Sequence, residues 1–216
     1  MNGDRHPPLV GVLFPILRVV AFFVFLFFAA PLRILQKRNV RRSGPLLVIS
    51  NHLSNTDPVV VQYSCPRLIH FLARKELFSM GGLGKFVRLW GAVPIKQSSA
   101  DKGAIKRSIE LLKAGECVGI FPEGQLSPDG RLLELFDGTA LIVRLSGAPC
   151  VCVGLQGTNR VMPHPRVVPT WAFSRITATW GEVKEFSRES TTEEIMGWIE
   201  SELKRLSHQE TDGHHP

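Results

Sequence analysis

The residues of this 216-residue chain that could do chemistry are concentrated in two short polar segments. In the first, four residues separate His52 from Asp57. A histidine can take a proton from a hydroxyl group, and a carboxylate bonded to its other ring nitrogen fixes the imidazole tautomer and stabilises the imidazolium. The pair therefore predicts a general base with an orienting acid. The alternative is an Asp57 that caps a helix beside an ordinary loop histidine.

The second segment is the tetrapeptide Phe121, Pro122, Glu123 and Gly124, which ends an apolar run. Proline cannot continue a central strand, because it lacks the N–H group that the ladder needs. We therefore expect the strand to stop here, with Glu123 and Gly124 facing a crevice. The alternative is a turn with an exposed glutamate.

Both segments follow short apolar runs of the kind that form buried strands. Strands are predicted over 45–50, 68–72, 92–95, 117–121 and 149–155, and an exposed edge strand over 175–183. Helices are predicted from Asp57 onward and over 100–114, 135–145 and 195–206, with a broken helix over 75–90 and capping-box spacings over 190–194. This alternation predicts an α/β fold with a mostly parallel central sheet and helices on both faces. Sites in such folds lie at the carboxyl ends of strands.

The N-terminal segment differs in character from the rest. Between residues 7 and 32 the only charged residue is Arg18, and Pro15 interrupts the run. This length predicts an apolar membrane-anchoring helix that either spans the bilayer or lies within one leaflet. Basic residues then gather over 33–42, which predicts that the following domain is on the cytoplasmic face. A secretory signal peptide is the alternative.

The amino-acid composition narrows the classes of protein to which the chain can belong. Hydrophobic residues make up 44% of the chain and charged residues 21%, which excludes a disordered chain. The net charge of +7 indicates an anionic partner: nucleic acid, a membrane surface or a phosphate-bearing substrate. No nucleic-acid motif is present, so we expect no nucleic-acid partner. The four cysteines, Cys65, Cys117, Cys150 and Cys152, have no paired spacing and are predicted to be buried thiols in a reducing compartment.

These motifs resemble the glycerolipid (lysophospholipid) acyltransferase family, typified by lysophosphatidic acid acyltransferase. Asn51, His52 and Asp57 match its Asn-His-x4-Asp block, and residues 121–124 match its Phe-Pro-Glu-Gly block. Weaker matches at 91–95, 101–104, 112–115 and 147–155 extend the resemblance over about residues 40–185. With the apolar N-terminal stretch and the polar C-terminal residues, it predicts a membrane-associated segment and basic linker over 1–42, an acyltransferase domain over 43–207 and a loose tail over 208–216.

The resemblance also implies an activity in phospholipid biosynthesis. His52, oriented by Asp57, would activate the free hydroxyl of a lysolipid to attack the thioester of acyl-CoA or acyl carrier protein. The favoured acceptor is 1-acyl-sn-glycerol-3-phosphate, which would give phosphatidic acid. Membrane lipid is a further partner, and no cofactor and no metal are implied. The alternatives are another lysolipid acceptor, or a non-catalytic membrane lipid-binding protein of the same fold.

The chain departs from the family where the acceptor phosphate is expected to bind. Gln97, with Lys96 beside it, occupies one usual arginine position, and Gln125 and Leu126 occupy the other. A guanidinium binds phosphate through two parallel hydrogen bonds, which glutamine cannot do. Lys96 or Arg131 could replace the missing arginine. The substrate-binding residues implied are therefore Lys96, Gln97, Phe121, Pro122, Glu123, Gly124 and Arg131.

Overall fold

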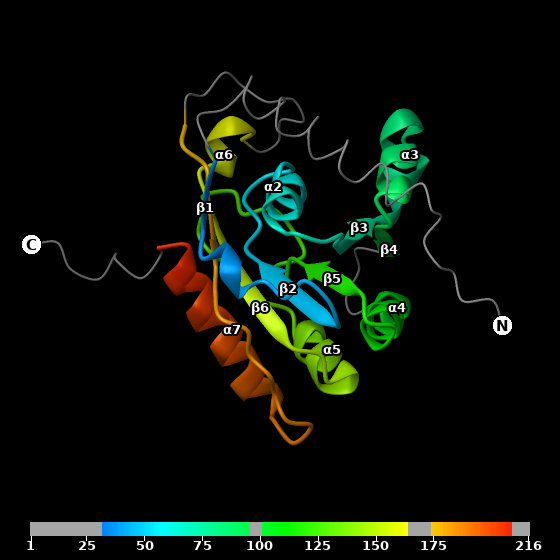
Figure 1. Cartoon of the computed structure of the whole chain (residues 1–216). Coiled ribbons are helices and arrows are strands. Elements are labelled where there is room, and N and C mark those ends of the chain that lie inside the picture. Colours follow the sequence, from blue (N-terminus) through cyan, green and yellow to red (C-terminus); the bar gives the residue numbers. More distant parts are fainter. Residues whose placement is uncertain (1–31, 96–100, 164–173, 209–216) are drawn as a thin grey trace, which may run out of the picture.

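The fold is given by a computed structural model that describes residues 32–95, 101–163 and 174–208 (Figure 1). Within them, seven strands form one sheet in the order β1-β7-β6-β2-β5-β3-β4. The strands are β1 (Arg33–Leu35), β2 (Leu46–Ser50), β3 (His70–Arg74), β4 (Val93–Ile95), β5 (Cys117–Ile120), β6 (Cys150–Gln156) and β7 (Thr177–Trp180). All neighbouring strands are parallel except β6 and β7, so β1 and β7 run opposite to the other five.

Helices cover both faces of this sheet. They are η1 (Lys37–Asn39), α2 (Asp57–Ser64), η2 (Lys75–Ser79), α3 (Gly81–Leu89), α4 (Lys102–Lys113), α5 (Gly138–Ser146), α6 (Thr158–Val161) and α7 (Thr192–Leu206). Helices α2 and α6 lie on one side of the sheet, and α4, α5 and α7 lie on the other (Figure 1). Apolar residues of α2 and α6 share one core cluster, and those of α4, α5 and α7 share the other. The mostly parallel α/β sheet predicted from the sequence is therefore confirmed.

Side-chain alternation along the central strands explains the two clusters. In β2, Leu46 and Val48 point to one cluster while Leu47 and Ile49 point to the other. Successive strand residues face opposite sides of a sheet, so a strand covered on both faces is apolar throughout. This is why β2 and β6 were recognisable as continuous apolar runs.

Helix ends follow local sequence signals. Asp101 caps α4 by accepting hydrogen bonds from the backbone N–H groups of Gly103 and Ala104. Thr191 and Glu194 form the predicted capping box of α7. The broken helix expected over 75–90 is two helices, η2 and α3.

The sheet extends further on one side than the sequence indicated. β1 pairs in parallel with β7, so β7 lies inside the sheet with Trp180 fully buried, and the prediction of an exposed edge strand over 175–183 is wrong. β1 also lies within the stretch 1–42, for which the sequence predicts a membrane segment and linker. Arg41 of that stretch pairs with Glu185, with 2.7 Å between Nη2 and Oε1. The ordered domain therefore includes residues before position 43.

The predicted apolar membrane segment, 7–32, lies outside the described residues except for Leu32, as does most of the tail 208–216. Among the helices that the structure describes, none has the length and apolar character to cross a bilayer.

Candidate active site

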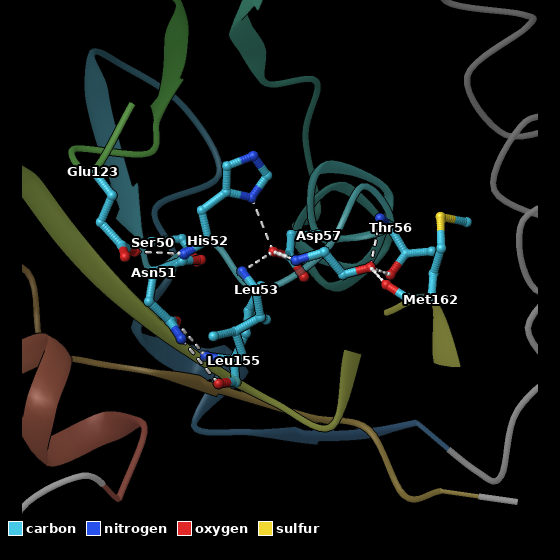
Figure 2. Close-up of polar contacts among 10 residues, drawn as sticks. Ser50, Asn51, His52, Leu53, Thr56, Asp57, Glu123, Leu155 and Met162 are labelled. Atoms are coloured by element: carbon cyan, nitrogen blue, oxygen red, sulfur yellow. Dashed lines mark hydrogen bonds and ion pairs between the residues drawn. The ribbon is translucent and has the colours of Figure 1, made fainter. Parts of the chain in front are cut away.

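His52 lies on the turn that joins the end of β2 to α2, at the carboxyl edge of the sheet, and Asp57 is the first residue of α2. Nδ1 of His52 is 3.0 Å from Oδ2 of Asp57 (Figure 2). Asp57 is fully buried, whereas the His52 side chain is 17% exposed. The structure thus brings together the two side chains whose spacing suggested a base and its orienting acid.

Backbone donors fix the Asp57 carboxylate. Oδ2 accepts hydrogen bonds from the N–H groups of Leu53 at 2.5 Å and Ser54 at 2.7 Å, in addition to its contact with His52. Thr56, not Asp57, is the N-cap residue of α2. The alternative of a merely helix-capping aspartate is therefore wrong, because the carboxylate binds the turn that carries His52.

Asn51 fastens this turn to the sheet. Its Nδ2 donates to the backbone oxygen of Leu155 at 3.1 Å, and its Oδ1 accepts from the N–H of Leu155 at 2.7 Å. The amide thus pairs with the end of β6 as a strand residue would. Asn51 is fully buried, so its contribution is to position the turn.

Glu123 lies inside the protein, close to the backbone of His52. Its Oε1 accepts from the N–H of His52 at 2.7 Å (Figure 2). Its Oε2 accepts from the N–H of Leu133 at 2.9 Å. The residue is 1% exposed, which corrects the expectation that its carboxylate faces the crevice. Burial raises the pKa of Glu123, and the two N–H donors partly oppose that rise. Glu123 therefore shapes the site through His52.

The segment after β5 holds His52 from a second direction. The backbone oxygen of His52 accepts from the N–H of Ser127 at 2.8 Å. Gly124 permits the turn: its φ is +65°, and a Cβ there would lie 2.7 Å from Cε2 of Phe136. Sequence reasoning missed Ser127 and Leu133, because both act through backbone N–H groups that no residue type announces.

Replacing Glu123 with glutamine tests whether its carboxylate holds the backbone N–H groups of His52 and Leu133 in place. Glu123→Gln should lower the free energy of unfolding by about 1–3 kcal/mol, because its NH2 group would face one of the two buried N–H donors. The measurement is chemical denaturation of the full chain. The same change at Glu134, an exposed residue of the same segment, is the matched control. Equal free energies of unfolding for the two variants would show that the hydrogen bonds of the Glu123 carboxylate do not stabilise the fold.

Phe121 and Pro122 complete the motif, and both make contacts with the protein around His52. The ring of Phe121 stacks on the imidazole of His52, with centroids 4.0 Å apart. Pro122 is buried, and its backbone oxygen accepts from the N–H of Phe136 at 2.9 Å. Both residues thus organise the segment around His52.

Only some of the residues at the predicted phosphate site lie in the described part of the chain. Arg131 has an exposed side chain on the turn after Ser127, and its N–H donates to Oδ1 of Asp129 at 2.9 Å. This hydrogen bond lowers the pKa of the exposed Asp129. Gln125 is exposed and Leu126 is half-buried. Lys96 and Gln97 lie outside the described residues.

The arrangement suits proton transfer at one nitrogen. Nε2 of His52 points away from Asp57 and has no hydrogen-bond partner in the described part of the chain (Figure 2). A carboxylate on Nδ1 keeps the proton there and leaves Nε2 as the acceptor. Across the described ranges, no group of three or more His, Cys, Asp or Glu side chains could hold a metal ion.

Comparison with known proteins agrees with these motifs. The family described as Acyltransferase matches residues 32–156. Over 140 residues the chain is 30% identical to the 1-acyl-sn-glycerol-3-phosphate acyltransferase of Bacillus subtilis, covering 64% of this chain and 69% of that protein. It is 33% identical over 121 residues to the chloroplastic enzyme of that name, BAT2, from Brassica napus, covering 55% of this chain. The match spans only 35% of the length of the Brassica protein.

A solved structure shows the same fold. The 1-acyl-sn-glycerophosphate acyltransferase PlsC from Thermotoga maritima superposes with a TM-score of 0.78 at 22% sequence identity. The superposition covers 94% of this chain and 82% of that one. Because the family matches more than half of the sequence, including both motifs around His52, the chain belongs to the acyltransferase family.

Proposed function

We propose that the chain transfers an acyl group from acyl-CoA or acyl carrier protein to the free hydroxyl of a lysolipid. The proposed acceptor is 1-acyl-sn-glycerol-3-phosphate and the product phosphatidic acid. The observation that carries the proposal is the contact of His52 with Asp57, which leaves Nε2 facing outward. The acceptor is supported by the relatives from Bacillus subtilis and Brassica napus, whose names specify it.

In this mechanism His52 is the general base. Nε2 removes the hydroxyl proton while the lysolipid oxygen attacks the carbonyl carbon of the thioester. The new C–O bond forms, the C–S bond breaks, and Nε2 gives the proton to the departing thiolate. The products are an ester and a free thiol, so both bonds and the proton are accounted for. Asp57 stabilises the imidazolium between the two transfers.

Direct transfer needs no protein nucleophile, and the described thiols are poorly suited to that role. Burial raises the pKa of Cys150 to about 12 and raises that of Cys152 well above its usual range. In Cys117, a hydrogen bond with Cys65 and burial raise the pKa as well. A thiol that stays protonated does not attack a carbonyl.

A transfer assay with a panel of acceptors tests the function. Radiolabelled acyl-CoA and acyl carrier protein are each offered with 1-acyl-sn-glycerol-3-phosphate and with lysolipids of other headgroups. We expect phosphatidic acid as the main product. Faster transfer to a lysolipid without a phosphomonoester would favour the alternative acceptor, in line with Gln97, Gln125 and Leu126 at the usual arginine positions. Lipid binding without any transfer would contradict the enzymatic proposal.

We also propose that the chain is membrane-associated, with its acyltransferase domain on the cytoplasmic face. The support is the apolar stretch 7–32 followed by basic residues over 33–42. The full-length protein is expected to stay with the membrane pellet after alkaline carbonate extraction. Protease added to the outside of intact spheroplasts should leave its domain uncut. Release by carbonate, or cleavage from outside, would contradict the anchor or the orientation respectively.

A further inference from the structure

Three aromatic rings form a stack that ends on the face of His52. The His52 and Phe121 rings are 4.0 Å apart between centroids at an interplanar angle of 19°. The Phe121 and Phe71 rings are 5.6 Å apart at 13°. The residues come from the end of β2, the end of β5 and from β3, which are consecutive neighbours in the sheet. The stack therefore runs from the carboxyl ends of β2 and β5 to the first half of β3.

The inner end of the stack is fixed in the core. Phe71 is 6% exposed and is the register partner of Gly119 in β5. A Cβ at Gly119 would lie 2.5 Å from Cδ1 and from Cε1 of Phe71, and 2.7 Å from Cγ2 of Ile69. The missing side chain at position 119 thus leaves the space that the Phe71 ring occupies. Phe71 in turn stacks against the ring of Phe121.

His52 is contacted by three residues from two parts of the chain, α2 and the segment after β5. Asp57, on α2, contacts Nδ1. Glu123, after β5, holds the backbone N–H. The Phe121 ring covers one face of the imidazole. Asp57 and Glu123 are the charged side chains that form hydrogen bonds with His52 in the described part of the chain, so any effect of Phe121 adds to theirs.

We propose that Phe121 is a positioning residue for proton transfer, whose ring keeps Nε2 of His52 directed outward and stabilises the imidazolium that forms during the reaction. The first effect follows from shape: a flat ring at stacking distance limits rotation of the imidazole about its contact with Asp57. The second follows from charge, because the face of an aromatic ring is negative and attracts a cation. This role rests on the proposed function of His52 and goes beyond it.

The test replaces the ring while keeping apolar volume. In Phe121→Leu, the charged imidazole loses its aromatic neighbour, so the titration midpoint of the His52 ring should fall by about half to one pH unit. The acid limb of kcat/KM should move to lower pH by the same amount. Phe121→Tyr keeps the ring and should keep the wild-type midpoint. Phe186→Leu, which removes the ring that packs edge-on against Trp198, is the matched control and should leave it unchanged.

NMR of isotope-labelled histidine in the full chain, in detergent micelles, gives the midpoint without any activity; the His52→Ala spectrum identifies the signal. Placing a trifluorinated phenylalanine at position 121 keeps the shape of the ring and weakens the charge of its face. It should lower the midpoint in the same direction even if the leucine variant is unstable. An unchanged midpoint in the leucine or the fluorinated protein would overturn the proposal. If the midpoint shifts in these variants but the wild-type protein transfers no acyl group, the role of the Phe121 ring would stand and the proposed function would be overturned.

Discussion

Replacing His52 with alanine is expected to lower kcat for acyl transfer by about three orders of magnitude while the protein stays folded. A positioned general base contributes roughly 10²–10⁴ in rate, and Nε2 of His52 is the nitrogen that faces outward from the turn. The folded state loses the contact of the imidazole with Asp57 and its stacking on Phe121, so the free energy of unfolding should fall by about 1–3 kcal/mol. Initial rates with a radiolabelled acyl donor and denaturation curves measure the two quantities.

The matched control is His208→Ala. His208 is exposed and follows the last helix, so the same substitution there should leave the rate within about twofold of the wild type. A His52→Ala protein that is folded and keeps more than about a tenth of the wild-type kcat would show that another group removes the hydroxyl proton.

The second large effect is expected for Asp57→Asn, which should lower kcat by about 10²–10⁴. An asparagine oxygen can still accept from Leu53, Ser54 and His52, so the turn can keep its shape. What disappears is the negative charge that stabilises the imidazolium. The new amide NH2 would occupy the place of Oδ1, which is buried and without a partner in the described part of the chain, at a cost of about 1–3 kcal/mol in unfolding free energy.

Comparison with Asp57→Ala separates chemistry from structure. In the Asp57→Ala variant the buried N–H groups of Leu53 and Ser54 have no acceptor. Its free energy of unfolding should therefore be lower than that of the asparagine variant by about 1–3 kcal/mol. Asp137→Asn, at the exposed N-cap of α5, is the matched control and should not alter kcat. If the asparagine variant at position 57 is as active as the wild type, the charge of Asp57 has no part in the reaction.

The contact between His52 and Asp57 could be predicted from the sequence because its determinants are local. A strand, a short turn and a helix that begins at Asp57 bring two residues of one segment together. The inward direction of Glu123 could not be predicted in this way. Its partners are backbone N–H groups of His52 and Leu133, and the first lies 71 positions away in the chain.

The same distinction explains the outcome for the strands. β2 and β6 are buried on both faces and appear as continuous apolar runs. β1 has three residues, of which Arg33 and Leu35 are exposed, and it exists through pairing with a strand more than 140 positions later. Without β1, the sequence of β7 is compatible with an edge position. The short length of β1 and its pairing with a distant strand, rather than a local sequence pattern, determine the structure on that side of the sheet.

The most direct test of the account is a double-mutant cycle on kcat for acyl transfer to 1-acyl-sn-glycerol-3-phosphate, using the wild type, His52→Ala, Asp57→Asn and the double variant. If Asp57 acts only through the imidazole, removing it after His52 is gone should change little, and the double variant should match His52→Ala within about threefold. Multiplication of the two single losses, to about 10⁵-fold or more, would show that the residues act independently and would contradict the proposed base and its orienting acid.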